Sequence, residues 1–172
     1  MSPVYEFFGN TPSVGPEVFL APNATVIGEV SLGRGASAFY GAVIRGDSGQ
    51  ISVGEETNLQ DNVVLHADPG FPTSVGDRVS VGHGAVVHGC TIEDDCLIGM
   101  GATVMNGTRI GAGSLIAGGA VVLEGSVIPP RSLVAGVPAK VRRELTDQEF
   151  AGIQQNAAHY SVLAQHHRAL HG

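Results

Sequence analysis

The chain has 172 residues, only nine of them lysine or arginine, and a formal net charge of −7 at pH 7. Phosphate neutralisation needs clustered positive charge, so this balance argues against a nucleic-acid-binding protein. With 25 glycines and 5% aromatic residues, the composition favours a narrow interior of small and β-branched side chains. The sequence has neither an apolar run of about 18 residues nor a secretory signal, so we expect a cytoplasmic protein with no membrane partner.

A repeat of six residues runs through most of the chain. It is interrupted in the first half, where aliphatic residues recur at Leu20, Val26, Leu32, Ala38 and Ile44, then Val53, Leu59 and Leu65, then Val75, Val81 and Val87. From Ile92 it is unbroken: Ile92, Ile98, Val104, Ile110, Ile116, Val122, Ile128 and Val134. On an α-helix this series would spread over three stripes, whereas an even period suits a strand pleat with one turn per unit. Three such sides close a coil of about 18 residues, which predicts a hexapeptide β-helix.

Three breaks interrupt the repeat, at residues 45–52 (RGDSGQIS), 66–74 (HADPGFPTS) and 88–91 (HGCT). Each break contains or adjoins polar residues that a β-helix does not need, and functional residues tend to lie where regularity fails. The position two residues before each repeat aliphatic is small and should also point inward. Cys90 and Cys96 occupy this position, so we expect buried free thiols rather than a disulfide.

The C-terminal region predicts a helix. We expect a β-helix domain over 1–142, with Pro138 ending the last coil, and a C-terminal α-helix over 143–172. Thr146 and Glu149 form a capping box, and helical spacing is followed by Phe150, Ile153, Ala157, Tyr160 and Ala164. A helix of about 20 residues should therefore lie along one side of the prism. We expect solvent exposure for the histidines on or after this helix: His159, His166, His167 and His171.

Counting through the breaks places Arg45, His66 and His88 in one column at one corner of the prism. The same count stacks Asp61 and His83 one side away, so His66 and His88 converge within a chain but His83 does not. Two stacked imidazoles can share one ion. A cyclic trimer would supply the third ligand if His83 of one subunit faced this pair on the next. Three histidines and an open position are typical of catalytic zinc; the alternative is that each histidine is only a surface residue.

The segments IRGD (44–47), NLQDNVVLH (58–66) and VGHGAVVHGC (81–90), together with IPPRSLVAGVPAKVRR (128–143), resemble the γ-class carbonic anhydrase family. The resemblance implies an all-β fold, a left-handed parallel β-helix homotrimer with a metal at each subunit interface. By this resemblance His66 and His88 come from one subunit and His83 from the next. The implied activity is the reversible hydration of carbon dioxide to bicarbonate by a metal-bound hydroxide. Zn²⁺ is the expected metal, and imidazole ligands also suit Fe²⁺ or Co²⁺.

The resemblance also suggests roles for other residues. Gln60 would orient the hydroxide and a substrate oxygen through its amide. Arg45 and Asp47 look like the family's interface ion pair, and Arg45 could pair with Asp61 or Asp47 across the trimer contact. We favour a structural role for Arg45 and Asp47, which fix the subunit registration. Tyr160 could donate a hydrogen bond in the metal pocket or simply pack on the prism.

Two departures from the active prototypes leave fast turnover open. Ser48 stands where those enzymes carry a glutamate after the aspartate of RGD, and the segment after His66 is short, with Asp68 as its sole acid. Other functions also remain open: a metal-dependent acyl-CoA thioester hydrolase, a hexapeptide acyltransferase, or a weakly active or non-catalytic relative. The three aligned histidines and the lack of a long insertion favour the metal enzyme over the acyltransferase.

Overall fold

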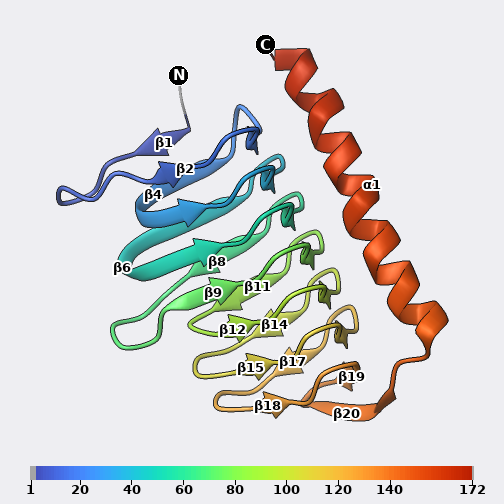
Figure 1. The fold of residues 1–172 in the computed structure, drawn as a ribbon. Helices are drawn as coiled ribbons and strands as arrows, with labels where there is room; N and C mark the ends of the chain where they lie inside the picture. Colours follow the sequence, from blue (N-terminus) through green and yellow to red (C-terminus); the bar gives the residue numbers. More distant parts are fainter. Residues whose placement is uncertain (1–2, 172) are drawn as a thin grey trace.

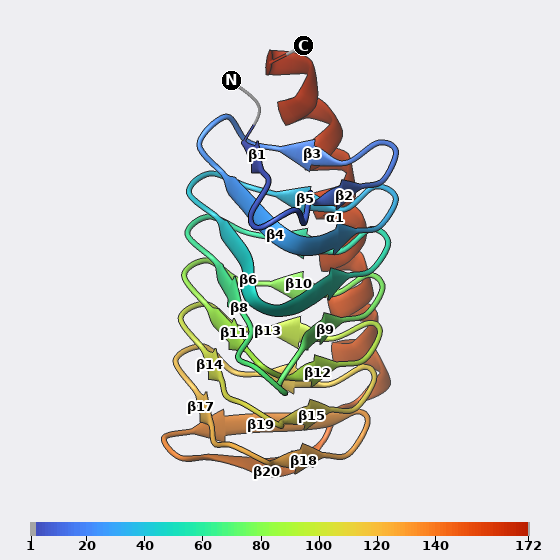
Figure 2. The ribbon, with the colours of Figure 1, turned by 90° about the vertical axis from the view of Figure 1, so that its left-hand side faces the viewer.

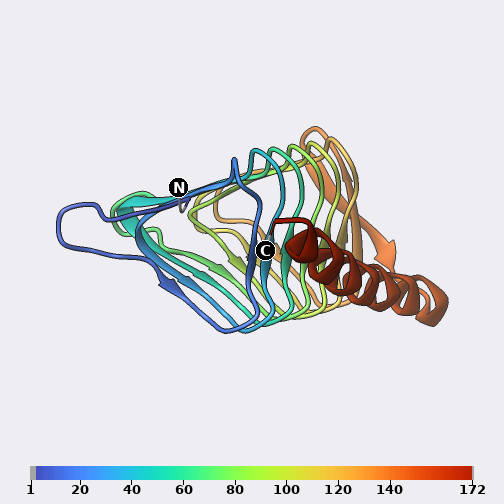
Figure 3. The ribbon, with the colours of Figure 1, turned by 90° about the horizontal axis from the view of Figure 1, so that it is seen from above.

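The computed structural model describes residues 3–171. Short strands joined by tight turns wind into a left-handed parallel β-helix of triangular cross-section, and one C-terminal helix runs along its side (Figures 1 and 3). The sequence prediction of an all-β prism with a flanking helix is therefore confirmed.

One face of the prism is an eight-stranded sheet. In chain order its strands are β3 (Phe19–Leu20), β5 (Ser37–Ala38), β7 (Asn58–Leu59), β10 (Ser80–Val81), β13 (Leu97–Ile98), β16 (Leu115–Ile116), β19 (Ser132–Gly136) and β20 (Ala139–Glu144). All neighbours pair in parallel except β19 and β20, which form an antiparallel hairpin. Pro138 therefore lies in the turn of this hairpin and does not end the sheet, because the chain reverses there and pairs back on the last coil.

The second sheet covers the other two faces, which meet at a corner (Figure 2). One face carries β8 (Val64–His66), β11 (Val86–His88), β14 (Thr103–Val104) and β17 (Val121–Val122). The other face carries β9 (Thr73–Val75), β12 (Thr91–Ile92), β15 (Arg109–Ile110) and β18 (Val127–Ile128). Two long strands, β4 (Thr25–Leu32) and β6 (Val43–Val53), connect the faces, and the N-terminal strands β1 (Val4–Tyr5) and β2 (Ser13–Val14) pair with β4.

The break predicted at 45–52 is a bent strand rather than a loop. β6 continues through this segment for 11 residues, paired with β4 across a register shift between Gly28 and Val30. The extra residues carry the strand around the corner. Gly28 has a positive φ of 80°, and a Cβ there would collide with the carbonyl oxygen of Gly46, so the bend depends on glycine. The segment after His66 does form a loop, closed by a bridge between Asp68 and Phe71.

The repeat aliphatics fill the interior of the prism in stacked columns. Ile92 is opposite Ile110, and Ile110 is opposite Ile128, which confirms a coil of eighteen residues. The predicted inward positions of Cys90 and Cys96 are also confirmed. Both are buried free cysteines, and burial raises the pKa of each thiol to about 12, so neither is a ready nucleophile.

Shortening one side chain in these columns should lower the stability of the fold. Ile110 is fully buried, and we expect Ile110→Ala to lower the free energy of unfolding by about 2–5 kcal/mol through lost burial and a residual cavity. Val127→Ala is the matched control, because the Val127 side chain is exposed. Urea denaturation followed by circular dichroism measures both. Equal, small changes in the two variants would contradict a tightly packed interior.

Helix α1 (Asp147–His171) packs on the eight-stranded sheet, where it contacts β3, β7 and β10. Its N-terminus has the predicted capping box: the Thr146 amide donates to Glu149 Oε2 (2.9 Å) and the Glu149 amide to Thr146 Oγ1 (3.2 Å). Ile153, Ala157 and Ala164 are buried against the prism. Within residues 3–171, no helix is both long and apolar enough to cross a bilayer.

The expectation that all the C-terminal histidines are solvated is wrong for His167, which is half-buried; His159, His166 and His171 are exposed, as expected. The Tyr40 hydroxyl lies 2.9 Å from His167 Nδ1 and 3.1 Å from His171 Nε2. The imidazole of His167 also contacts the edges of the Phe39 and Tyr40 rings. The helix has 25 residues rather than about 20, so its last turns reach the first coils and these histidines dock it there.

Candidate metal centre

His66 and His88 end two neighbouring strands at the corner where the two faces of the second sheet meet. They are register partners on β8 and β11, and Arg45 on β6 is the partner of His66, as the sequence count predicted. The imidazoles face each other, with His66 Nδ1 2.9 Å from His88 Nε2. Buried Thr73 ties the two coils together: its hydroxyl donates to the His66 carbonyl (2.6 Å) and accepts from the Gly89 amide (2.8 Å).

The outer nitrogen of His66 is held by Asp47. His66 Nε2 lies 3.0 Å from Asp47 Oδ1, and Arg45 Nη1 donates to Asp47 Oδ2 at 2.6 Å. Burial alone would raise the pKa of Asp47, but the hydrogen bonds from Arg45 and His66 outweigh it and lower this pKa below its ordinary value. Asp47 is therefore ionised at neutral pH and can only accept hydrogen bonds, so Nε2 of His66 carries a hydrogen.

The outer nitrogen of His88 is held by Asn106, a residue that the sequence analysis did not select. His88 Nδ1 lies 2.7 Å from Asn106 Oδ1, and Asn106 Nδ2 donates to Asp68 Oδ2 at 2.9 Å. Because an amide oxygen only accepts, Nδ1 of His88 carries a hydrogen.

These two assignments leave the facing nitrogens without hydrogens when the rings are neutral. Two lone pairs 2.9 Å apart repel unless a proton or a metal ion lies between them. The separation is compatible with bonds of about 2.1 Å from both nitrogens to one shared ion. Asp68 adds a carboxylate: ligand atoms of His66, Asp68 and His88 all lie within 4.8 Å of one another. The donor set fits a divalent transition metal.

His83 lies at a different corner from this pair. Its Nδ1 is 2.8 Å from Asp61 Oδ2, and its side chain is 44% exposed. Asp61 and His83 thus lie in one column, as the sequence count predicted. Of the two partners suggested for Arg45, the one it pairs with in this chain is Asp47. With Nδ1 facing a carboxylate, the available lone pair of His83 is on Nε2, 3.3 Å from the Tyr160 hydroxyl.

A hollow beside His83 brings together three other polar side chains: Gln60, Asn156 and Tyr160. Gln60 is buried and its Nε2 donates to Asn58 Oδ1 at 3.1 Å. The buried Oδ1 of Asn156, also missed by the sequence analysis, has no hydrogen-bond partner among the described residues. Such an atom is costly unless something donates to it.

Tyr160 lies between the prism and His83. Its ring packs edge-on against Phe39, with centroids 5.5 Å apart, and its hydroxyl reaches His83 Nε2. Burial raises the pKa of Tyr160, and the charge of Asp61 raises it further. The hydroxyl therefore stays protonated at neutral pH and can donate.

The chain is similar to known proteins over most of its length. The family model for bacterial transferase hexapeptide (six repeats) matches residues 72–106 and 89–124. The chain is 46% identical over 168 residues to γ carbonic anhydrase 1, mitochondrial, of Arabidopsis thaliana, covering 94% of this chain and 61% of that protein. It is 52% identical over 152 residues to a probable carbonic anhydrase of Methanocaldococcus jannaschii, covering 88% of this chain and 96% of the relative. The chain belongs to the γ carbonic anhydrase family.

A solved structure shares the whole fold of this γ carbonic anhydrase family member. A putative acetyltransferase from Bacillus cereus superimposes with a TM-score of 0.96 at 36% identity, covering 97% of each chain. The chain spans about three-fifths (61%) of the Arabidopsis relative's length.

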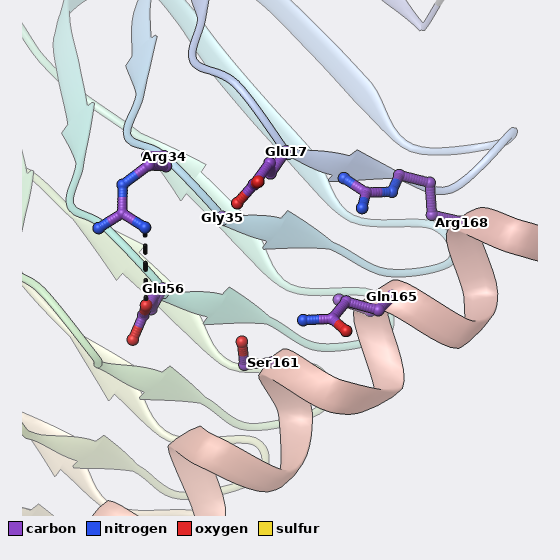
Figure 4. A pocket seen from close by; sticks show the side chains of 8 residues that line it. Glu17, Arg34, Gly35, Glu56, Ser161, Gln165 and Arg168 are labelled. Carbon is purple, nitrogen blue, oxygen red and sulfur yellow. Dashed lines mark ion pairs between the residues drawn. The ribbon is translucent and has the colours of Figure 1, made fainter.

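A second hollow lies between the helix and another corner, and its lining does not include His66, His83 or His88 (Figure 4). It is lined by Glu17, Arg34, Glu56 and Arg168, so its positive and negative charges balance. Arg34 pairs with Glu55 (2.6 Å) and approaches Glu56 (4.0 Å), and these side chains are about half exposed. Exposed pairs of this kind contribute little binding energy.

Proposed function

We propose that the protein catalyses the reversible hydration of carbon dioxide to bicarbonate at a metal site shared between subunits of a homotrimer. The observation that carries the proposal is the facing pair of His66 Nδ1 and His88 Nε2, 2.9 Å apart, with both outer nitrogens bound to acceptors. Metal-binding histidines are characteristically oriented in this way by a partner on the second nitrogen. Zn²⁺ is the proposed metal, with Fe²⁺ or Co²⁺ as alternatives.

The third ligand in this proposal is His83 of a neighbouring subunit. Asp61 holds His83 Nδ1 at 2.8 Å, which leaves the lone pair on Nε2. The Tyr160 hydroxyl, 3.3 Å from Nε2, would turn to the substrate when a metal takes this lone pair. The half-exposed side chain is accessible to another chain. At each of the three histidines, one nitrogen is thus bound to an oxygen acceptor and the lone pair is on the other nitrogen. A trimer would bring the corner that carries His83 against the corner that carries His66 and His88 of the next subunit.

The surrounding residues would bind and orient the substrate. When bound, the metal would lower the pKa of a coordinated water to about 7 and so supply hydroxide at neutral pH. Tyr160 would donate a hydrogen bond, and the Gln60 amide would hold a polar atom in the same hollow. Arg45 and Asp47 would act indirectly, by fixing the ring of His66. The proposed location of the protein is the cytoplasm.

The test is the rate of carbon dioxide hydration, followed by stopped flow with a pH indicator, on protein of measured metal content. We expect activity that scales with bound metal and disappears on chelation. We also expect the rate to rise with buffer concentration, because Ser48 and the short Asp68 loop leave few acids to carry the proton away. The same samples are assayed for acyl-CoA hydrolysis by thiol release. Metal-dependent thioester cleavage without carbon dioxide hydration would favour the thioester hydrolase and contradict the proposal.

A further inference from the structure

We infer that Asn106 is a positioning residue for His88, and that Asp68 holds Asn106 in the orientation this requires. The inference rests on the proposed metal site, because it concerns which nitrogen of His88 is presented to the ion. Asn106 would not touch the metal or the substrate. It would act through the His88 ring, by accepting the hydrogen on Nδ1 and leaving the lone pair on Nε2.

The chain of hydrogen bonds has a single direction. An asparagine amide can face either way, but the Asp68 carboxylate can only accept, so the amide group that faces it must be the NH₂. Asn106 Nδ2 donates to Asp68 Oδ2 at 2.9 Å, and Oδ1 is therefore turned towards His88 Nδ1 at 2.7 Å. The carboxylate of Asp68 thus determines, through one amide, the tautomer of a ring two hydrogen bonds away.

The backbone around this chain is arranged to admit the Asn106 side chain. Gly89, directly after His88, has a φ of 58°, and a Cβ there would collide with Asn106 Oδ1. Asp68 is fixed by the short loop, since the Phe71 amide donates to the Asp68 carbonyl at 2.9 Å. The turn at Asn106 does not need the side chain, because Gly107 supplies the positive φ there. A side chain that serves neither the turn nor the core, yet has space reserved for it, points to the histidine.

Zinc affinity in competition with a chromogenic chelator tests the inference. We expect Asn106→Leu, which keeps the volume but removes the acceptor, to weaken zinc binding by about 10- to 100-fold, the usual effect of losing such a partner. Asn106→Asp alone would lose the donor to Asp68 and place two carboxylates side by side, so it is combined with Asp68→Asn. This double variant keeps an acceptor for His88 Nδ1 and a donor facing that acceptor, and it should bind zinc at least about tenfold more tightly than Asn106→Leu. Glu124→Gln is the matched control. Glu124 lines a surface hollow together with Asp68, His88 and Asn106, and its substitution should leave zinc affinity unchanged.

A folded Leu variant with wild-type affinity, or a Leu variant and a double variant that are equally weak, would overturn the inference. If the Leu variant does not fold, Asn106→Ala takes its place in the same comparison. The tautomer provides a second readout on the wild type: ¹⁵N-histidine NMR of the zinc-loaded protein should show a hydrogen on Nδ1 of His88, and a hydrogen on Nε2 would overturn the inference. His88→Ala separates the two hypotheses, because unchanged zinc affinity in that variant contradicts the metal site itself.

Discussion

His88→Ala should weaken zinc binding by more than about 100-fold and lower carbon dioxide hydration at least in proportion. The effect should exceed about 100-fold because losing only the hydrogen-bond partner of a metal-binding histidine already weakens metal binding by about 10- to 100-fold. The substitution removes one of two facing nitrogens and leaves His66 Nδ1 without the group that lies 2.9 Å from it. The fold should survive, because the interior contact on β11 is made by buried Val87 and not by His88.

Metal content after gel filtration, together with stopped-flow hydration kinetics, measures the effect. His166→Ala is the matched control, because it removes an exposed imidazole from the helix and should change neither quantity. A His88→Ala protein that retains a full complement of metal would show that the facing pair is not the metal site.

His83→Ala should remove metal to a comparable extent, although His83 lies at another corner of its own chain. No single chain brings all three histidines together in the described residues, so the loss would have to act across a subunit contact. The β-helix should remain folded, since the His83 side chain is 44% exposed and bonded to Asp61 at the surface. Metal content, circular dichroism and the mass of the assembly in solution are the measurements.

His159→Ala serves as the control for His83→Ala, because His159 is an exposed histidine of the helix. The expected outcome for His83→Ala is a folded trimer with little zinc. If His83→Ala kept its metal while His88→Ala lost it, the ligand set would instead be the group of His66, Asp68 and His88 within one chain.

The column of His66 and His88 could be predicted from the sequence because a β-helix turns counting into geometry. Once each coil has eighteen residues, side chains on successive coils stack, whatever their chemistry. The same count reaches Asn106, eighteen residues after His88, so its position was accessible. Its role was not, because the direction of an amide and the tautomer of a ring depend on rotamers and on the Asp68 loop rather than on the repeat.

Other features depended on local geometry that the repeat does not encode. Extra residues between coils can form either a loop or a bent strand, and β6 is the latter because Gly28 and Gly46 permit close approach. Likewise, helical spacing predicted the buried stripe of α1 but not the contact of His167 with Tyr40 near its end. The burial of Asn156 Oδ1 could not be predicted either, because it depends on how the helix packs beside the hollow.

Mixed trimers test the shared site most directly. Neither His83→Ala nor His88→Ala subunits can form a complete site alone. A site becomes complete when the His66 and His88 pair of a His83→Ala subunit meets the intact His83 of a His88→Ala subunit. Random co-assembly in a ring, where each contact joins two different surfaces, should restore about a quarter of the sites. Recovery of about a quarter of the wild-type hydration rate per subunit is the predicted result; mixed trimers as inactive as either parent would contradict a site shared between subunits.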